Sequence, residues 1–144
     1  MKITKDAQDH GVPWEHEYGY AQAVKIGSMI YVSGQFSHDE EGNFVGPAPV
    51  GDDGNVLDHS NMEIQMRQTY KNAKKILGHY GADLDNVVEE VLYVTNMDAA
   101  LAVAGRLRKE AYGSQKPEVS STLLETPRLA LPHQLIEIKF IAKI

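Results

Sequence analysis

Two apolar runs separated by a two-residue turn open the regular part of the chain. Residues 21–26 and 29–35 carry most of the apolar side chains in this region, and Gly27 and Ser28 lie between them. Such a pair of runs is typical of a β-hairpin, because a short turn containing glycine reverses a strand directly. The pattern therefore predicts a hairpin over about residues 21–35.

Apolar residues at helical spacing follow in two later segments, residues 60–77 and 98–112. Ser60 and Glu63 match the S-x-x-E pattern of a capping box, and Asp98 is expected to cap the second helix. Each helix is expected to have one apolar face, formed by Met66, Tyr70, Ala73 and Leu77 in the first and by Leu101, Ala104, Leu107 and Ala111 in the second.

Three further segments, residues 87–95, 120–125 and 135–142, read as strands. The resulting order, ββ-α-β-α-ββ, predicts an α+β fold in which both helices pack on one face of a mixed sheet of four or five strands. The first and third of these strands are apolar at more than alternate positions, so the face without helices also favours burial. An apolar sheet face of this kind is an association surface, which predicts an oligomer.

Polar, glycine-rich and proline-rich stretches mark the irregular parts of the chain. Residues 1–18 are interpreted as an N-terminal extension, and residues 37–59 as a long acidic surface loop. Neither flank of that loop could build a core by itself, and 144 residues suit one domain. We therefore expect a single domain over residues 1–144.

Composition excludes several classes of protein. The chain has no cysteine, which excludes disulfides, thiol catalysis and cysteine-bound zinc or iron–sulfur centres. Its net charge of −6 disfavours binding to nucleic acid. No apolar stretch reaches the roughly 18 residues of a membrane span, and residues 1–6 lack an apolar signal region. We expect a cytoplasmic protein without a membrane partner.

The usual signatures of metal, nucleotide and nucleophilic sites are missing. The six histidines form no H-x-x-x-H or H-E-x-x-H pair, so they are interpreted as surface residues in loops, and no metal is expected. No glycine-rich phosphate loop occurs, and no cofactor is expected. Ser33 lacks the G-x-S-x-G context of a hydrolase nucleophile, and the Ser120–Ser121 pair lacks an evident base.

Two polar residues in apolar surroundings are candidates for chemistry. Glu137 lies inside the most apolar strand, and Tyr20 directly precedes the predicted hairpin. The pattern leaves two interpretations of Glu137 open, a solvent-facing strand carboxylate or a carboxylate that faces a cleft. A tyrosine at the position of Tyr20 more often packs than reacts.

Several segments together resemble the Rid (YjgF) family, whose members have been labelled reactive-intermediate (enamine/imine) deaminases, L-PSP endoribonucleases or translation inhibitors. The similarity covers about residues 19–142, with the acidic loop as an insertion. It is carried by the stretches GYAQAV from Gly19, IYVSGQ from Ile30, MEIQMRQTYKN from Met62, GADLDNVV from Gly81, YVTNM from Tyr93 and LIEI from Leu135. The resemblance implies a chorismate-mutase-like fold and a homotrimer with a ligand cleft at each subunit interface.

The resemblance also implies roles for individual residues. Glu137 matches the glutamate that holds the attacking water, and Tyr20 matches a tyrosine of the cleft. Gly34 matches the glycine whose backbone contacts the ligand, and its neighbour Gln35 is placed among the substrate-binding residues. The family reaction is hydrolysis of an enamine or imine to a 2-oxo acid and ammonia.

One departure from the family pattern concerns the substrate. Active deaminases of the family carry an arginine in a P-x-R-S stretch that binds the substrate carboxylate. Here Val119 or Ser121, depending on the alignment, stands at that position. Ser121 and Thr122 are then expected to bind by their hydroxyls, and Arg106 or Arg128 is either the substitute cation or a solvated arginine.

The leading hypothesis is a hydrolytic deaminase of a small enamine or imine other than the usual one, for example an aminomuconate-like compound. The alternative is a small-molecule-binding trimer without catalysis, which the missing arginine favours. The acidic charge and the lack of a histidine pair argue against an endoribonuclease.

Overall fold

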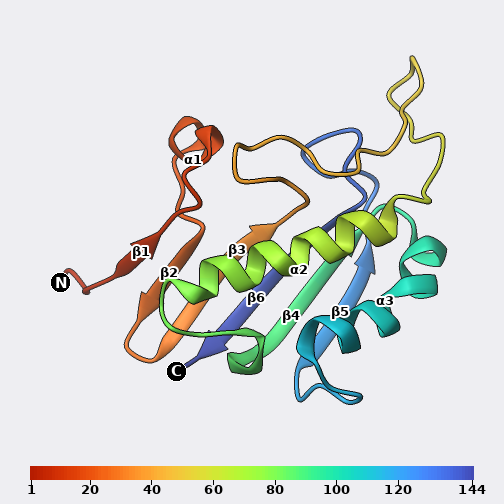
Figure 1. The fold of residues 1–144 in the computed structure, drawn as a ribbon. Coiled ribbons are helices and arrows are strands. Elements are labelled where there is room, and N and C mark those ends of the chain that lie inside the picture. The colour runs from red at the N-terminus through yellow and green to blue at the C-terminus, as the bar shows by residue number, and fades with distance from the viewer.

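The computed structural model describes residues 1–144, which form one six-stranded sheet with the two long helices on one side (Figure 1). The chain order is β1 (Asp6–Gln8), α1 (Pro13–Tyr18), β2 (Ala23–Ile26), β3 (Met29–Gln35), α2 (Met62–Gly78), the 3₁₀ turn η1 (Leu84–Asn86), β4 (Val87–Val94), α3 (Met97–Tyr112), β5 (Ser120–Glu125) and β6 (Ile136–Lys143).

The sheet is mixed, as the sequence predicts. Its strand order is β1-β2-β3-β6-β4-β5, with β4 and β5 parallel and every other pair antiparallel. The parallel pair needs a crossover, and α3 provides it. The predicted hairpin is confirmed as β2 and β3, with Gly27 at a φ of 58° in the turn. Gln35 at the end of β3 lies opposite Ile138 of the central strand β6.

The N-terminal segment is more ordered than predicted. Within residues 1–18, β1 pairs with β2 at the edge of the sheet, and α1 follows. A buried carboxylate holds this segment in place, because Glu15 accepts hydrogen bonds from the backbone N–H groups of His10, Gly11 and Val12 at 2.8, 2.9 and 2.9 Å. The extension is therefore part of the fold.

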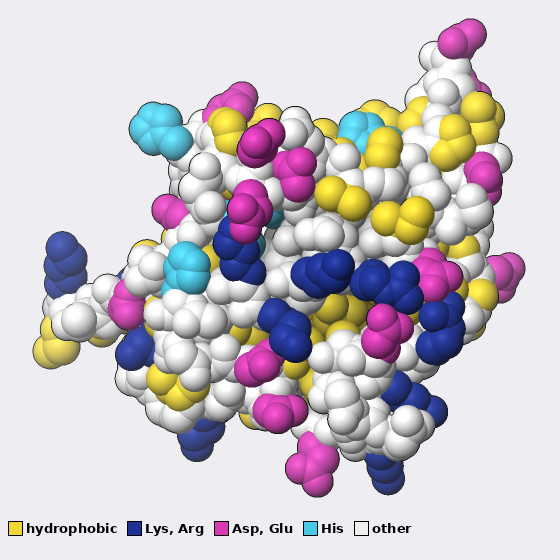
Figure 2. Space-filling model, viewed as in Figure 1, with side chains coloured by type: hydrophobic (Ala, Val, Ile, Leu, Met, Phe, Trp, Pro, Cys, Tyr) yellow, Lys and Arg dark blue, Asp and Glu magenta, His cyan; other side chains and the backbone are white.

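Helices α2 and α3 cover the same face of the sheet (Figure 1). The predicted apolar face of α2 is confirmed, since Met66, Tyr70, Ala73 and Leu77 are all buried. The prediction for α3 is wrong at Leu101, which is 62% exposed, because the buried stripe of that helix starts one residue earlier. Its buried residues are Ala100, Ala104, Leu107 and Tyr112. Acidic and basic side chains are intermixed over the outer surface of the helical layer, with several basic ones in a row across its middle (Figure 2).

The helix caps also differ from the predictions. The side chain of Asn96, not Asp98, caps α3 by accepting a hydrogen bond from the N–H of Ala99 at 2.9 Å. The predicted capping box of α2 does not form. The helix begins at Met62 with Asn61 at the N-cap position, so Ser60 lies one residue before the cap, and its hydroxyl donates to Asp58 at 2.9 Å.

The face opposite α2 and α3 carries exposed apolar side chains, as expected for strands that favour burial on both sides. Tyr31 of β3 is 45% exposed there and lies opposite Ile141 of β6. Leu124 of β5 and Val88 of β4 are also exposed. A single chain therefore leaves apolar sheet surface in water.

A buried charge cluster joins the sheet to the helices. Glu90 of β4 is fully buried and accepts hydrogen bonds from the hydroxyls of Tyr70, Tyr112 and Ser121 at 3.0, 3.1 and 3.0 Å. Arg108 of α3 pairs with the same carboxylate. Burial raises the pKa of both tyrosines, and the charge of Glu90 raises it further, so both hydroxyls stay protonated donors.

The predicted loop over residues 37–59 contains no helix or strand, only two isolated bridges, His38 with Phe44 and Val50 with Val56. The structure attaches its first half to the rest of the fold. The N–H of Ala48 donates to the carbonyl oxygen of His133 at 3.0 Å, and the Gln65 amide donates to that of Gly46 at 2.9 Å. This half of the loop thereby becomes a wall of the site described next.

Candidate functional site

A cavity of about 660 Å³ lies where α1, the start of the long loop and the segment before β6 meet. Figure 1 shows these three segments at the same end of the sheet. Aromatic side chains form much of its wall, namely Trp14, Tyr18, Tyr20, Phe36, Phe44 and His133. We call this cavity the aromatic pocket. It brings together three of the residues that the sequence analysis singles out, Tyr20, Gly34 and Glu137.

Glu137 is the candidate acid–base group of the aromatic pocket. It lies on the sheet face opposite the helices, because β6 alternates buried and more accessible positions. The Gln134 amide donates to its Oε2 at 3.1 Å, and no hydrogen bond of the protein reaches its Oε1. Burial raises the pKa of Glu137, and the bond from Gln134 opposes that rise. A carboxyl group with one fixed and one free oxygen is suited to accept and return a proton.

Gly34 permits the position of Glu137. A Cβ atom at residue 34 would lie 1.8 Å from Oε1 of Glu137 and 2.6 Å from its Cδ, and both distances are too short for a contact between non-bonded atoms. The pairing between β3 and β6 shifts register between Val32 and Gln35, which places the glycine beside the carboxylate. Residue 34 must therefore lack a side chain for Glu137 to reach this place.

The C-terminal end of α1 positions Tyr20 in the wall of the aromatic pocket. The helix ends at Gly19 in the left-handed conformation, with a φ of 71°, and the backbone N–H of Tyr20 donates to the Glu15 carbonyl at 3.1 Å. Burial and then the Glu15 charge raise the pKa of the Tyr20 phenol. Trp14 and Tyr18 of the same helix also line the cavity, and sequence reasoning missed both. Pro13 at the helix start and Gly19 after its end were the available signals.

Four other predicted site residues do not line the aromatic pocket in this chain. The Gln35 amide is buried and bonds to Gln22, to the backbone of Ser33 and to His10. Ser121 bonds to Glu90 and Arg108 in the buried cluster, and Arg106 pairs with Glu63 at 3.0 Å on the outer surface of the helices. Thr122 is exposed on β5, in register with Val91.

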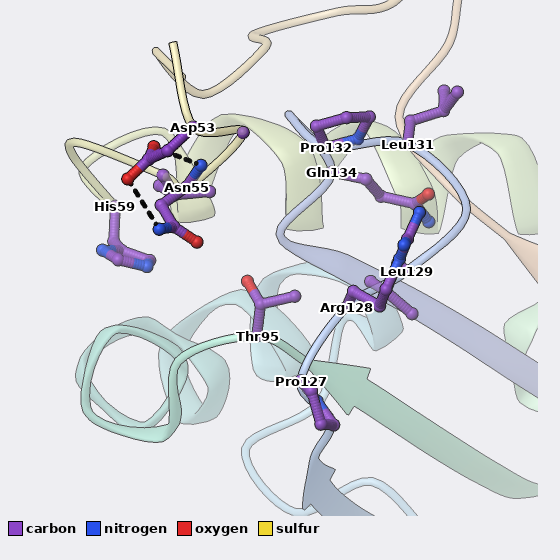
Figure 3. A pocket seen from close by; sticks show the side chains of 12 residues that line it. Asp53, Asn55, His59, Thr95, Pro127, Arg128, Leu129, Leu131, Pro132 and Gln134 are labelled. Atoms are coloured by element: carbon purple, nitrogen blue, oxygen red, sulfur yellow. Dashed lines mark hydrogen bonds between the residues drawn. The ribbon is translucent and has the colours of Figure 1, made fainter. Parts of the chain in front are cut away.

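Arg128 lines a second cavity of about 490 Å³ beside the aromatic pocket (Figure 3). Asp53, His59 and Thr95 line it as well, and Leu131 and Gln134 belong to the walls of both cavities. Arg128 forms no ion pair within the chain. The structure therefore places this arginine next to the site of Glu137 but outside it.

The histidines are less uniform than predicted. His38 is buried, so its interpretation as a surface residue is wrong, and its ring contacts His10 and Trp14 at centroid distances of 5.2 and 5.0 Å. Burial lowers the pKa of both His10 and His38. No three histidine or acidic side chains of the chain converge as metal ligands. No helix is long and apolar enough to cross a membrane.

Comparison with known proteins assigns the chain to a family. A family model described as endoribonuclease L-PSP matches residues 14–144. The chain belongs to the endoribonuclease L-PSP family. This is the same family, also called YjgF, that the sequence resembles, and the match begins at Trp14 in the wall of the aromatic pocket.

Individual relatives agree with this assignment. A RutC family protein of Saccharolobus solfataricus is 34% identical over 125 residues, covering 86% of each chain. A RutC family protein of Pyrococcus abyssi is 31% identical over 123 residues, covering 85% of this chain and 84% of the relative. The crystal structure of Rv2704 from Mycobacterium tuberculosis, a YjgF/YER057c/UK114 family member, is 28% identical with a TM-score of 0.72 and covers 98% of this chain and all (100%) of that one. Yeast Mmf1, 21% identical with a TM-score of 0.76, shares the fold over 97% of this chain and 98% of its own.

Proposed function

We propose that this protein is a hydrolytic deaminase of a small imine or enamine, with Glu137 as its acid–base group. One observation carries the proposal. Glu137 is half-buried in a walled cavity, has a raised pKa, and keeps one oxygen fixed by Gln134 and the other free. Membership of a family associated with imine and enamine deaminases supports the same chemistry.

The chemistry follows from that arrangement. Water adds to the carbon of a protonated C=N bond, and the Glu137 carboxylate accepts the proton that the water loses. Glu137 returns this proton to the nitrogen of the resulting carbinolamine. The C–N bond then breaks as the hydroxyl becomes a carbonyl, and its proton leaves through Glu137 to the departing ammonia. The products are a carbonyl compound and ammonium, and the carboxylate is regenerated.

The test is ammonia release from freshly generated imines with and without a carboxylate group. Glu137→Gln should lower kcat by about 10²–10⁴-fold, the usual contribution of a positioned acid–base group. Glu118→Gln is the matched control, because Glu118 is exposed in the loop before β5 and lies outside the aromatic pocket. Wild-type protein that releases no more ammonia than buffer for any imine would refute the proposal.

A second candidate function is ligand binding without turnover. The aromatic pocket favours it in one respect, since neither lysine nor arginine lines it to hold a substrate carboxylate. In that case ligands would stabilise the protein against heat, by about 2.7 kcal/mol at a concentration 100 times Kd, and no ammonia would appear.

We further propose that the exposed sheet face is covered by copies of the same chain, as a homotrimer. Tyr31 and Leu124 are large apolar side chains exposed on that face. Monomeric proteins rarely expose large apolar patches, so such a face favours association. Tyr31→Asp should shift the mass measured by light scattering from three chains toward one. A wild-type protein of monomeric mass would refute this assembly.

A further inference from the structure

Helix α1 is held against the rest of the fold by few side chains. Most of its residues are exposed, and the buried or half-buried ones are Val12 just before the helix, Trp14 and Glu15. Figure 1 shows α1 apart from α2 and α3, at the edge of the fold. Regions with so few buried contacts open locally at a small cost in free energy. The attachment of α1 therefore depends on what Trp14 and its neighbours contact.

Two histidines form much of that attachment. The ring of His38, at the start of the long loop, contacts Trp14 edge-on with centroids 5.0 Å apart and contacts His10 at 5.2 Å. His38 is 3% exposed, and His10 lies in the segment between β1 and α1. The side chains of Gln68 and Asn72 in α2 donate to the His38 carbonyl oxygen at 3.2 and 3.0 Å. The contact therefore joins a weakly held segment to one that is fixed to α2.

Each of these rings has one nitrogen in a hydrogen bond and one without a partner. His10 donates from Nε2 to Oε1 of Gln35 at 2.7 Å, and His38 donates from Nδ1 to the carbonyl oxygen of Asp39 at 2.8 Å. No hydrogen bond of the chain reaches Nδ1 of His10 or Nε2 of His38. The arrangement suits neutral rings, because a second proton on either ring has no acceptor within the chain.

Side chains of both charge signs surround the two rings. They are the carboxylates of Glu15, Asp39 and Glu40 and the ammonium groups of Lys71 and Lys75. A polar cavity of about 240 Å³ is lined by both rings and by α2, so it lies on the helical side of the sheet, away from the face proposed to bind other copies. Burial outweighs the carboxylates and lowers the pKa of both His10 and His38.

We propose that the contact between His10 and His38 is an acid-sensitive latch, which holds α1 closed when both rings are neutral and releases it when they are protonated. Because α1 supplies Trp14 and Tyr18 to the wall of the aromatic pocket, its release opens that wall. The latch does not depend on the proposed deaminase function.

The direction of the pH dependence follows from the lowered pKa of the two rings. A histidine released into water regains its ordinary pKa, so the open latch binds protons that the closed latch excludes. The latch is therefore fully closed above about pH 6.5 and weakens as pH falls toward the pKa of the closed state. Each titrating histidine changes the opening equilibrium by up to about tenfold per pH unit, and both together by up to about a hundredfold.

The fluorescence of Trp14 tests the latch, because Trp14 is the only tryptophan of the chain and contacts His38. The full chain is titrated from about pH 8 to about pH 4.5, the range in which histidines titrate. As pH falls, the emission should shift to longer wavelength and become more accessible to acrylamide, while the far-UV circular dichroism is unchanged. A folded protein whose Trp14 emission does not change, or changes only together with the circular dichroism, would overturn the latch.

Variants assign the transition to the two rings. His10→Gln keeps a hydrogen-bond donor and His38→Phe keeps a ring, and the double variant should retain the neutral-pH emission of Trp14 down to the lowest pH at which it is folded. Each single variant should lower the steepness from about a hundredfold to about tenfold per pH unit, which keeps the test decisive if the double variant does not fold. His16→Gln is the matched control, because His16 is an exposed histidine of α1, and it should change nothing. A transition that is equally steep in both single variants would refute the assignment.

Hydrogen exchange shows which segment is released. The backbone N–H groups of Gly19 and Tyr20 donate to the Glu15 carbonyl at 3.0 and 3.1 Å, and a released helix of six residues does not persist alone. After correction for the intrinsic pH dependence of exchange, these amides should lose protection at acidic pH while those of α2 keep theirs. Equal loss in both helices would indicate unfolding of the whole chain and would overturn the latch.

Discussion

Replacing Arg108 tests how the buried charge cluster supports the fold. Glu90 is fully buried, and Arg108, whose side chain is 21% exposed, is its only counter-charge within salt-bridge distance. Arg108→Met keeps the length of the side chain and leaves the Glu90 carboxylate with three hydroxyl donors and no positive charge. Removing one partner of a buried ion pair costs about 3–5 kcal/mol. The partial exposure of Arg108 argues for the lower end, about 3 kcal/mol.

Urea unfolding followed by circular dichroism, at one fixed protein concentration, measures this change. Arg106→Met is the matched control, because Arg106 lies on the same helix but pairs with Glu63 at the exposed surface, where an ion pair contributes little to stability. Adding Glu90→Gln to Arg108→Met should restore part of the stability, since the unpaired charge is removed. If Arg108→Met costs no more than Arg106→Met, the reasoning about a desolvated charge at Glu90 is refuted.

Three further predictions concern stability. Gly105→Ala should raise the free energy of unfolding by about 0.5–1 kcal/mol, because alanine favours the helical conformation more than glycine does. Gly105 lies within α3 with an ordinary helical φ, and an added Cβ meets nothing within 4 Å. A loss of stability in the same urea assay would contradict this prediction. Asn96→Ala should lower the free energy of unfolding by about 1 kcal/mol through loss of the α3 cap, whereas Ser60→Ala should lower it by less than about 0.5 kcal/mol. Equal losses would indicate that Ser60 caps α2 after all, as the sequence predicts. Glu137→Gln should stabilise the protein at neutral pH. The raised pKa of Glu137 means that the folded state binds the carboxyl proton more tightly than the unfolded state does. The stabilising contribution of Glu137 is therefore full below about pH 4 and is lost as pH rises through the folded pKa. Thermal unfolding at pH 4 and pH 7.5 should therefore show the gain only at the higher pH, and a gain of equal size at both would be inconsistent with burial of the charge.

Local patterns in the sequence were sufficient for most of the fold. The β2–β3 hairpin follows from two apolar runs around Gly27, and α2 follows from apolar residues at helical spacing. These signals depend only on neighbours a few residues apart. The sequence analysis missed three short elements, β1 and η1 with three residues each and α1 with six, and such lengths leave almost no periodicity to detect.

The site depended on tertiary structure to a much greater degree. The sequence indicated that Glu137 was unusual in its strand, and the family resemblance paired it with Tyr20 and Gly34. Only the β3–β6 pairing and its register shift bring Gly34 against the carboxylate, since the two residues are about one hundred positions apart in the chain. The same pairing of distant segments decides which polar residues are free, because Ser121 is satisfied by Glu90 instead of facing the aromatic pocket.

The sequence by itself thus determined most of the elements, the fold class and the family of this protein. The tertiary structure decided which side chains share one cavity, and with them the charge and shape that a ligand must match. The physical reason is that secondary structure arises from short-range backbone and side-chain preferences, whereas a pocket is built from contacts between segments that meet only after the chain has folded.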